Sequence, residues 1–193
     1  GSVSSPFFLG LFVGNWMFGV DTVVSLGSLL VGLAVVALTV VDGAAFLRVK
    51  TRGRVQQDVR AQGELAQAAY LVLAVAALVA GGVSSPAIAT ALTSLPALAL
   101  LGVTVVLAGA NVVAGRQDRH YLAFAAVAGQ VYALAALVAV TMYPLVDMAV
   151  GLTVDTAIVS TLPLNLTTIA ASFLLPLVFT YFVVLYSTFS GPV

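Results

Sequence analysis

Long apolar runs separated by short polar stretches dominate this chain. Many of them approach the roughly 20 apolar residues that a helix needs to cross a hydrocarbon core about 30 Å thick. The alternation over about ten residues that marks membrane β-strands is not seen. The pattern therefore predicts an all-α fold, a polytopic transmembrane helix bundle with about six spans in a single membrane domain, residues 1–193. The predicted spans are 5–19, 22–47, 68–83, 95–114, 121–143 and 164–189.

One short apolar run and three polar or irregular stretches lead to separate predictions. The first run is short and contains Asn15, so we expect an incomplete or interfacial helix there. Residues 48–67 are polar, and we expect them to be partly helical and outside the hydrocarbon. A tight polar loop is expected at 115–120 and a long loop at 144–163.

Composition supports a membrane protein. The chain is 62% hydrophobic and only 7% charged, whereas soluble domains average about 25% charged residues. The seven Lys and Arg balance the seven Asp and Glu, so the net charge gives no case for a nucleic-acid partner. The lack of Cys excludes disulfides, thiolate metal sites and cysteine nucleophiles.

The basic residues fix an expected orientation. All seven lie in the connections after the second and fourth runs, which six alternating spans place on one side of the membrane. The positive-inside rule makes that side cytoplasmic, so we expect both termini in the cytoplasm. The opposite side receives Asp21, Asp147 and Asp155 and no Lys or Arg. The residues expected to anchor the cytoplasmic face are Arg48, Lys50, Arg52, Arg54, Arg116 and Arg119.

Three polar residues inside the runs are the candidate functional side chains: Asp42, Asn111 and Gln130. An ionisable group inside a span costs about 2.5 to 3.5 kcal/mol at the helix centre, so Asp42 has either a functional or a packing role. Asn111 lies at a comparable depth, and we expect an Asp42 to Asn111 hydrogen bond. Gln130 falls near the bilayer centre, either on a quinone or proton path or as a bridge between helices. The one histidine, His120, is expected to be a solvated loop residue, because no second ligand lies at a useful spacing.

Several stretches together resemble one family. "VVDGAAFLRVKTRG" at 40–53 is similar to the helix end and "GAxxLxxKTxG" motif in subunit II of the cytochrome bd family of quinol oxidases. "PFFLGLFVGNW" at 6–16 resembles that family's helix ending in Gly-Asn, and "MYP" at 142–144 resembles the start of its final outer loop. "LNLTTIAASFLLPLVFTYFVVLYSTF" at 164–189 is similar to its last helix.

The resemblance implies a haem-free supporting subunit, without catalytic, cofactor-binding or metal-binding residues of its own, in a prokaryotic plasma membrane. Its partner would be a haem-bearing subunit I that carries haem b and haem d, oxidises quinol and reduces oxygen to water. Subunit II would support that partner's fold and is a candidate to help define oxygen or proton access.

The chain also departs from the family. About three N-terminal helices with "GFDLG" and "WDGNEVW" type motifs are absent, and "TLPLNLTT" replaces "YNASSS" before the last helix. We therefore expect the C-terminal two thirds of such a subunit, with a separate N-terminal fragment as a candidate partner. Two alternatives stay open: a small secondary transporter or channel with a site among the three intramembrane polar residues, and a packing subunit of another membrane complex.

Overall fold

The computed structural model describes residues 3–19, 23–148, 150–158 and 160–188, so Asp21 lies outside the described residues. Along the chain, the elements are α1 (Ser4–Phe18), α2 (Leu26–Lys50), α3 (Arg54–Ser84), α4 (Pro86–Leu92), α5 (Leu95–Arg116), α6 (His120–Met142), β1 (Leu145–Asp147), β2 (Leu152–Thr153), α7 (Val154–Ala157) and α8 (Thr161–Thr188).

The all-α membrane architecture is confirmed. Five helices, α2, α3, α5, α6 and α8, are long and apolar enough to cross a membrane. The first predicted span is α1, whose 15 residues rise only about 22 Å, which is less than the thickness of the hydrocarbon core. The expectation of an incomplete helix therefore agrees with its length.

The region predicted as a long loop, 144–163, contains regular structure. β1 and β2 pair antiparallel, with Leu145 opposite Thr153. Thr153 then caps the short helix α7, because its hydroxyl accepts a hydrogen bond from the Thr156 amide at 3.3 Å. These elements are too short to give a periodic pattern, which is why the sequence predicted only a loop.

Small residues bring α1 against the first half of α2. A Cβ atom added to Gly10 would lie 2.8 Å from the Cα of Gly32, and one added to Gly14 would lie 2.7 Å from the Cα of Ser28. Only a hydrogen in place of a side chain permits this approach, as expected for small residues spaced four apart. Asn15 secures the turn, since its amide donates to the Val23 carbonyl at 2.9 Å.

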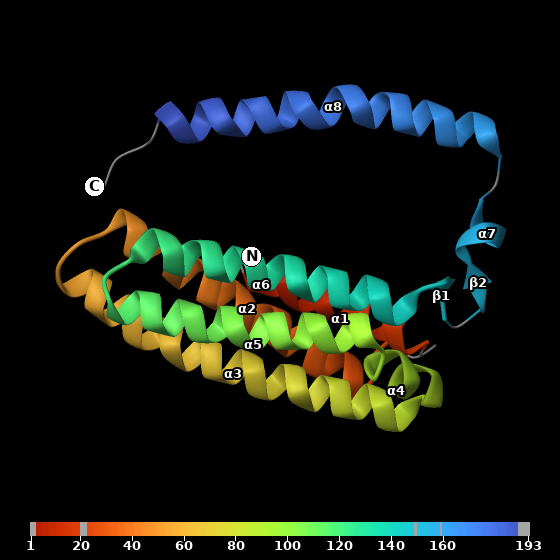
Figure 1. Cartoon of the computed structure of the whole chain (residues 1–193), viewed down its shortest axis with the longest axis horizontal. Coiled ribbons are helices and arrows are strands. Elements are labelled where there is room, and N and C mark those ends of the chain that lie inside the picture. Colours follow the sequence, from red (N-terminus) through yellow and green to blue (C-terminus); the bar gives the residue numbers. More distant parts are fainter. Residues whose placement is uncertain (1–2, 20–22, 149, 159, 189–193) are drawn as a thin grey trace.

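The bundle is built from α1, α2, α3, α5 and α6 (Figure 1), with α2 packed against α1, α3 and α6, and α5 packed against α6. Its central core comes from α2, α3 and α6 and comprises Ala34, Leu38, Val41, Ala45, Tyr70 and Val127. Figure 1 shows α8 running beside the bundle but set apart from it, and none of its described side chains is buried.

The connections that carry the basic residues meet at one end of the bundle. The α2–α3 connection and the α5–α6 turn lie together there, and the β1–β2 hairpin and α4 lie at the opposite end (Figure 1). We call the first of these the basic end. Its segregation agrees with the charge pattern of the sequence, and its cytoplasmic orientation stays a prediction of the positive-inside rule.

Candidate functional site

The site begins with an arginine buried between helices. Arg48 lies in the last turn of α2, and only 2% of its surface is exposed. Its guanidinium passes two glycines, since a Cβ added to Gly63 on α3 would lie 3.9 Å from Arg48 Nη2, and one added to Gly115 on α5 would collide with Arg48 Nη1. The missing side chains form a slot, which we call the arginine slot (Arg48, Gly63 and Gly115).

From this slot a chain of hydrogen bonds crosses the bundle. Arg48 Nη2 donates to Asn111 Oδ1 at 3.1 Å, and Asn111 Nδ2 donates to Gln67 Oε1 at 3.0 Å. Gln67 Nε2 donates to Gln130 Oε1 at 2.9 Å, and Gln130 Nε2 donates back to Gln67 Oε1 at 3.2 Å. These four residues, which we call the amide network, come from α2, α5, α3 and α6.

The amide network is buried, so the loss of any one hydrogen-bond partner in it is costly. Arg48, Gln67 and Asn111 are each 2% exposed, and Gln130 is 0% exposed. A polar bridge between membrane helices contributes only about 0.6 to 2 kcal/mol, but a buried amide without a partner costs about 1 to 3 kcal/mol. The network therefore adds little free energy to the association of the four helices. It disfavours any alignment of these helices in which one of its polar groups loses its partner.

The predicted bond between Asp42 and Asn111 is wrong. The Asn111 side chain bonds to Arg48 and Gln67 instead. Asp42 is only partly buried, and among the described residues it has no hydrogen-bond or ion-pair partner. It lies on an apolar groove between α1, α2 and α6, beside Leu38 and Val131. The groove faces away from Asn111 because residues 42 and 48 are six apart and leave α2 in different directions.

The residues predicted to anchor the cytoplasmic face divide into two kinds. Arg48 lies at the basic end but is buried there, which the sequence did not predict. Arg52, Arg54, Arg116 and Arg119 are exposed, and Lys50 is half-buried. Arg116 also contacts Glu64 of α3 at 3.5 Å.

Gln67 was missed because the sequence placed residues 48–67 outside the hydrocarbon. The structure makes most of this stretch the first part of α3, which packs along the bundle. Gln56 meets His120 at 3.1 Å, and eleven residues further along α3 Gln67 meets Gln130. The similar spacings, eleven residues from Gln56 to Gln67 and ten from His120 to Gln130, are the signal that could have identified this pairing.

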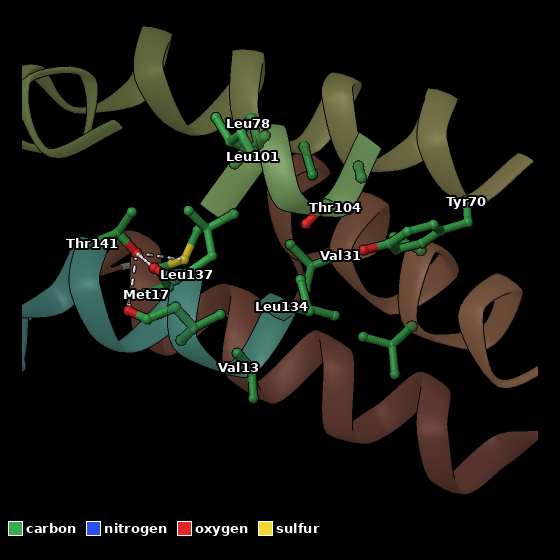
Figure 2. Close-up of a pocket in the computed structure, with 15 residues that line it drawn as sticks. Val13, Met17, Val31, Tyr70, Leu78, Leu101, Thr104, Leu134, Leu137 and Thr141 are labelled. Atoms are coloured by element: carbon green, nitrogen blue, oxygen red, sulfur yellow. Dashed lines mark hydrogen bonds between the residues drawn. The ribbon is translucent and has the colours of Figure 1, made fainter. Parts of the chain in front are cut away.

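A small apolar cavity lies in the half of the bundle away from the basic end. Its volume is about 70 Å³, and it is bounded by side chains of α1, α2, α3, α5 and α6. Figure 2 shows Tyr70 closing one side, with Met17 and Thr141 together on another. The Thr141 hydroxyl lies 2.8 Å from the Leu137 carbonyl oxygen, so its polar atom is already satisfied. Such a cavity favours small apolar molecules over water.

Comparison with known families gives a match along almost the whole chain. Residues 1–189 match the family described as "Cytochrome bd terminal oxidase subunit II". The chain belongs to the cytochrome bd terminal oxidase subunit II family. No curated protein matches it significantly. Membership confirms the resemblance seen in the sequence and makes the chain a multi-pass membrane protein of the bd oxidase family.

The bd oxidase family implies haem, and His120 is the one histidine that could serve as an axial ligand in this chain. Its Nε2 atom faces the Gln56 side-chain nitrogen at 3.1 Å. The surface around it is lined by arginines and other polar groups, whereas a haem needs a wide apolar pocket with an axial ligand directed into it. Among the described residues, no three His, Cys, Asp or Glu side chains lie close enough to hold a metal ion. The described residues do not fit a haem.

Proposed function

We propose that this chain is the haem-free supporting subunit of a membrane-bound bd-type quinol:oxygen oxidoreductase, a terminal respiratory oxidase. The observation that carries the proposal is the family match over residues 1–189. The sequence supports it, since one His and no Cys offer little for haem ligation. Haem b, haem d and quinol chemistry are accordingly assigned to a haem-bearing subunit I.

The exposed helix α8 supports the assignment of a large membrane partner. Its 25-residue segment Thr161–Leu185 is apolar enough to cross a membrane, and no residue of the 18-residue window that qualifies it is buried within the chain. Lipid can cover such a helix, but lipid contacts do not fix its position relative to a bundle. We assign that positioning to subunit I.

A share in oxygen access is the finer part of the proposal. Molecular oxygen is small and apolar, and the cavity bounded by Met17, Tyr70 and Thr141 is apolar and lies among five helices. This supports storage or passage of a small apolar molecule in the bundle. The amide network offers Arg48 and three amides but no carboxylate, so it supports a structural role better than a proton path.

Co-purification tests the proposal. The chain is isolated from its native membrane, and a reduced-minus-oxidised spectrum is recorded. We expect b-type and d-type haem bands and a larger companion polypeptide. After the polypeptides are separated under native conditions, the haem should remain with the companion. Recovery without a companion and without haem bands would refute the oxidase assignment, and haem retained by this chain would refute its haem-free role.

A further inference from the structure

The basic end contains a polar hollow that shares Arg48 with the amide network. It lies between the end of α2, the start of α3 and the α5–α6 turn, and its volume is about 770 Å³. Three arginines line it, Arg48, Arg52 and Arg60, with Asp118 as the one carboxylate among its lining residues. The hollow therefore has an excess of positive charge.

Two buried donors in this hollow lack acceptors. Arg48 Nε and His120 Nδ1 are both inaccessible to solvent, and neither has a hydrogen-bond partner among the residues that the structure describes. Both residues line the hollow. The need for a further acceptor is greater at Arg48 than at His120. The charge of Arg48 is buried, and the one side-chain acceptor shown for it is the neutral amide of Asn111.

The geometry around Gln56 shows that His120 Nδ1 carries a proton. Gln56 Nε2 lies 2.9 Å from the Arg48 carbonyl oxygen, which can only accept, so this atom of Gln56 is the amide nitrogen. The same nitrogen lies 3.1 Å from His120 Nε2, which must then accept. A neutral imidazole that accepts at Nε2 has its hydrogen on Nδ1.

We propose that this hollow binds a phosphate oxyanion, supplied by the headgroup of an anionic phospholipid. A phosphate group offers several strong acceptors, and arginine binds it with short, charge-assisted hydrogen bonds. Arg48 Nε and His120 Nδ1 are not exposed to the hollow as it stands, so the bound group would reach them only after the Arg48 and His120 side chains turn. Basic pockets between membrane helices at the positively charged side of a bundle are suited to such headgroups. This inference does not depend on the assignment to an oxidase.

The location favours a lipid over free phosphate. The hollow lies where the helices that line it end, which is headgroup depth if the basic end faces the membrane surface. The exposed Tyr121 ring also lines it, and aromatic rings of this kind gather at the membrane interface. A lipid held there would join α2, α3 and α6 from outside.

Two variants and a matched control test the site. Arg52→Gln removes an exposed charge that lines the hollow, whereas Arg54→Gln removes an exposed charge from the same segment that does not line it. His120→Gln removes the Nδ1 donor and keeps an acceptor for Gln56. Each lost charge or donor should weaken binding about fivefold, the equivalent of roughly 1 kcal/mol. Arg54→Gln should change it less than twofold.

A fourth variant should strengthen binding. Asp118 has a φ of 57°, a left-handed conformation that Asn also tolerates. Asp118→Asn therefore removes the opposing carboxylate without new backbone strain. We expect an affinity for the anionic lipid about threefold to fivefold higher, because one repulsive charge is lost near the surface.

The measurement uses the full chain in its purified native complex. After delipidation, binding is followed by native mass spectrometry and by the unfolding midpoint with phosphatidylglycerol, with phosphatidylcholine, or with inorganic phosphate alone. We expect retention and stabilisation with phosphatidylglycerol, and not with phosphatidylcholine. Equal binding of both lipids, or equal losses in Arg52→Gln and Arg54→Gln, would overturn the site. Saturation by inorganic phosphate without lipid retention would overturn the lipid assignment.

Discussion

At the scale of single residues, one absent side chain leaves room for a buried charge. Gly115 leaves room for Arg48 Nη1, whereas a Cβ at Gly63 would lie at an ordinary contact distance of 3.9 Å from Arg48 Nη2 and only 3.0 Å from Ala44 Cβ. Other glycines of the same bundle, such as Gly43 and Gly109, have no atom within 4 Å of the position that a Cβ would take. Glycine at 115 therefore fits the position of Arg48, and glycine at 63 fits the close approach of Ala44.

Gly115→Ala should therefore destabilise the bundle. The added methyl group collides with Arg48 Nη1, so the guanidinium must shift and weaken its hydrogen bond to Asn111, which costs about 0.5 to 1.5 kcal/mol. Gly109→Ala is the matched control on the same helix, and it should be neutral or slightly stabilising because Ala is the better helix former. Denaturant titration of the purified chain in detergent checks both, and equal midpoints for the two variants would contradict the slot.

The amide pair makes a second prediction at this scale. Gln67→Leu orphans Asn111 Nδ2 and both polar atoms of Gln130, so it should cost about 1 to 3 kcal/mol. Adding Gln130→Leu removes two of those orphans, and the double variant should be more stable than Gln67→Leu alone. Gln62→Leu, on an exposed face of α3, is the control. The same titration measures all of them, and additive losses would argue against the pair.

At the scale of elements, residue type predicted some of the packing and missed the rest. Apolar run length predicted α2, α5, α6 and α8, and the spacing of Gly10 and Gly14 agreed with close helix approach. The first half of α3 was expected to be partly helical, but its packing against the bundle was missed because its charges suggested solvent. Charge in a sequence does not say whether a neighbouring helix will face it, and the burial of Arg48 was missed for the same reason.

The α1–α2 contact can be tested at Gly14. A methyl group there would lie 2.7 Å from the Ser28 Cα, a backbone atom that cannot rotate away. We expect Gly14→Ala to separate the two helices and lower the unfolding midpoint, by about 1 to 3 kcal/mol in free energy. Gly43→Ala on α2, where the space is open, should leave the midpoint unchanged. Limited proteolysis of the α1–α2 turn provides an independent readout, and equal cleavage in both variants would refute the contact.

At the scale of the whole molecule, the three amides of the amide network pair with one another inside the bundle, and two kinds of surface stay open among the described residues. One is α8, and the other is the groove that holds Asp42. The sequence could locate Asp42 in a span but could not choose its neighbours, since helix-to-helix placement depends on packing that no single run contains. A carboxyl on an outer groove, without a partner among the described residues, is free to contact another chain.

Asp42→Asn should therefore act on assembly. The substitution breaks no hydrogen bond among the described residues, so the unfolding midpoint of the isolated chain should not change. We expect the yield of complex to fall and the turnover per assembled complex to stay the same. Yield is measured by co-purification and turnover by oxygen consumption. Normal assembly with lost turnover would instead assign proton handling to Asp42.

The arginine slot also constrains how this sequence can change over evolutionary time. A side chain at Gly115 requires the Arg48 guanidinium to move, so the two positions should change together. Gly63 is restricted by Ala44 Cβ and not by Arg48, so it should change independently of the arginine. Among relatives, a bulky residue at the position of Gly115 should therefore coincide with a smaller residue at the position of Arg48.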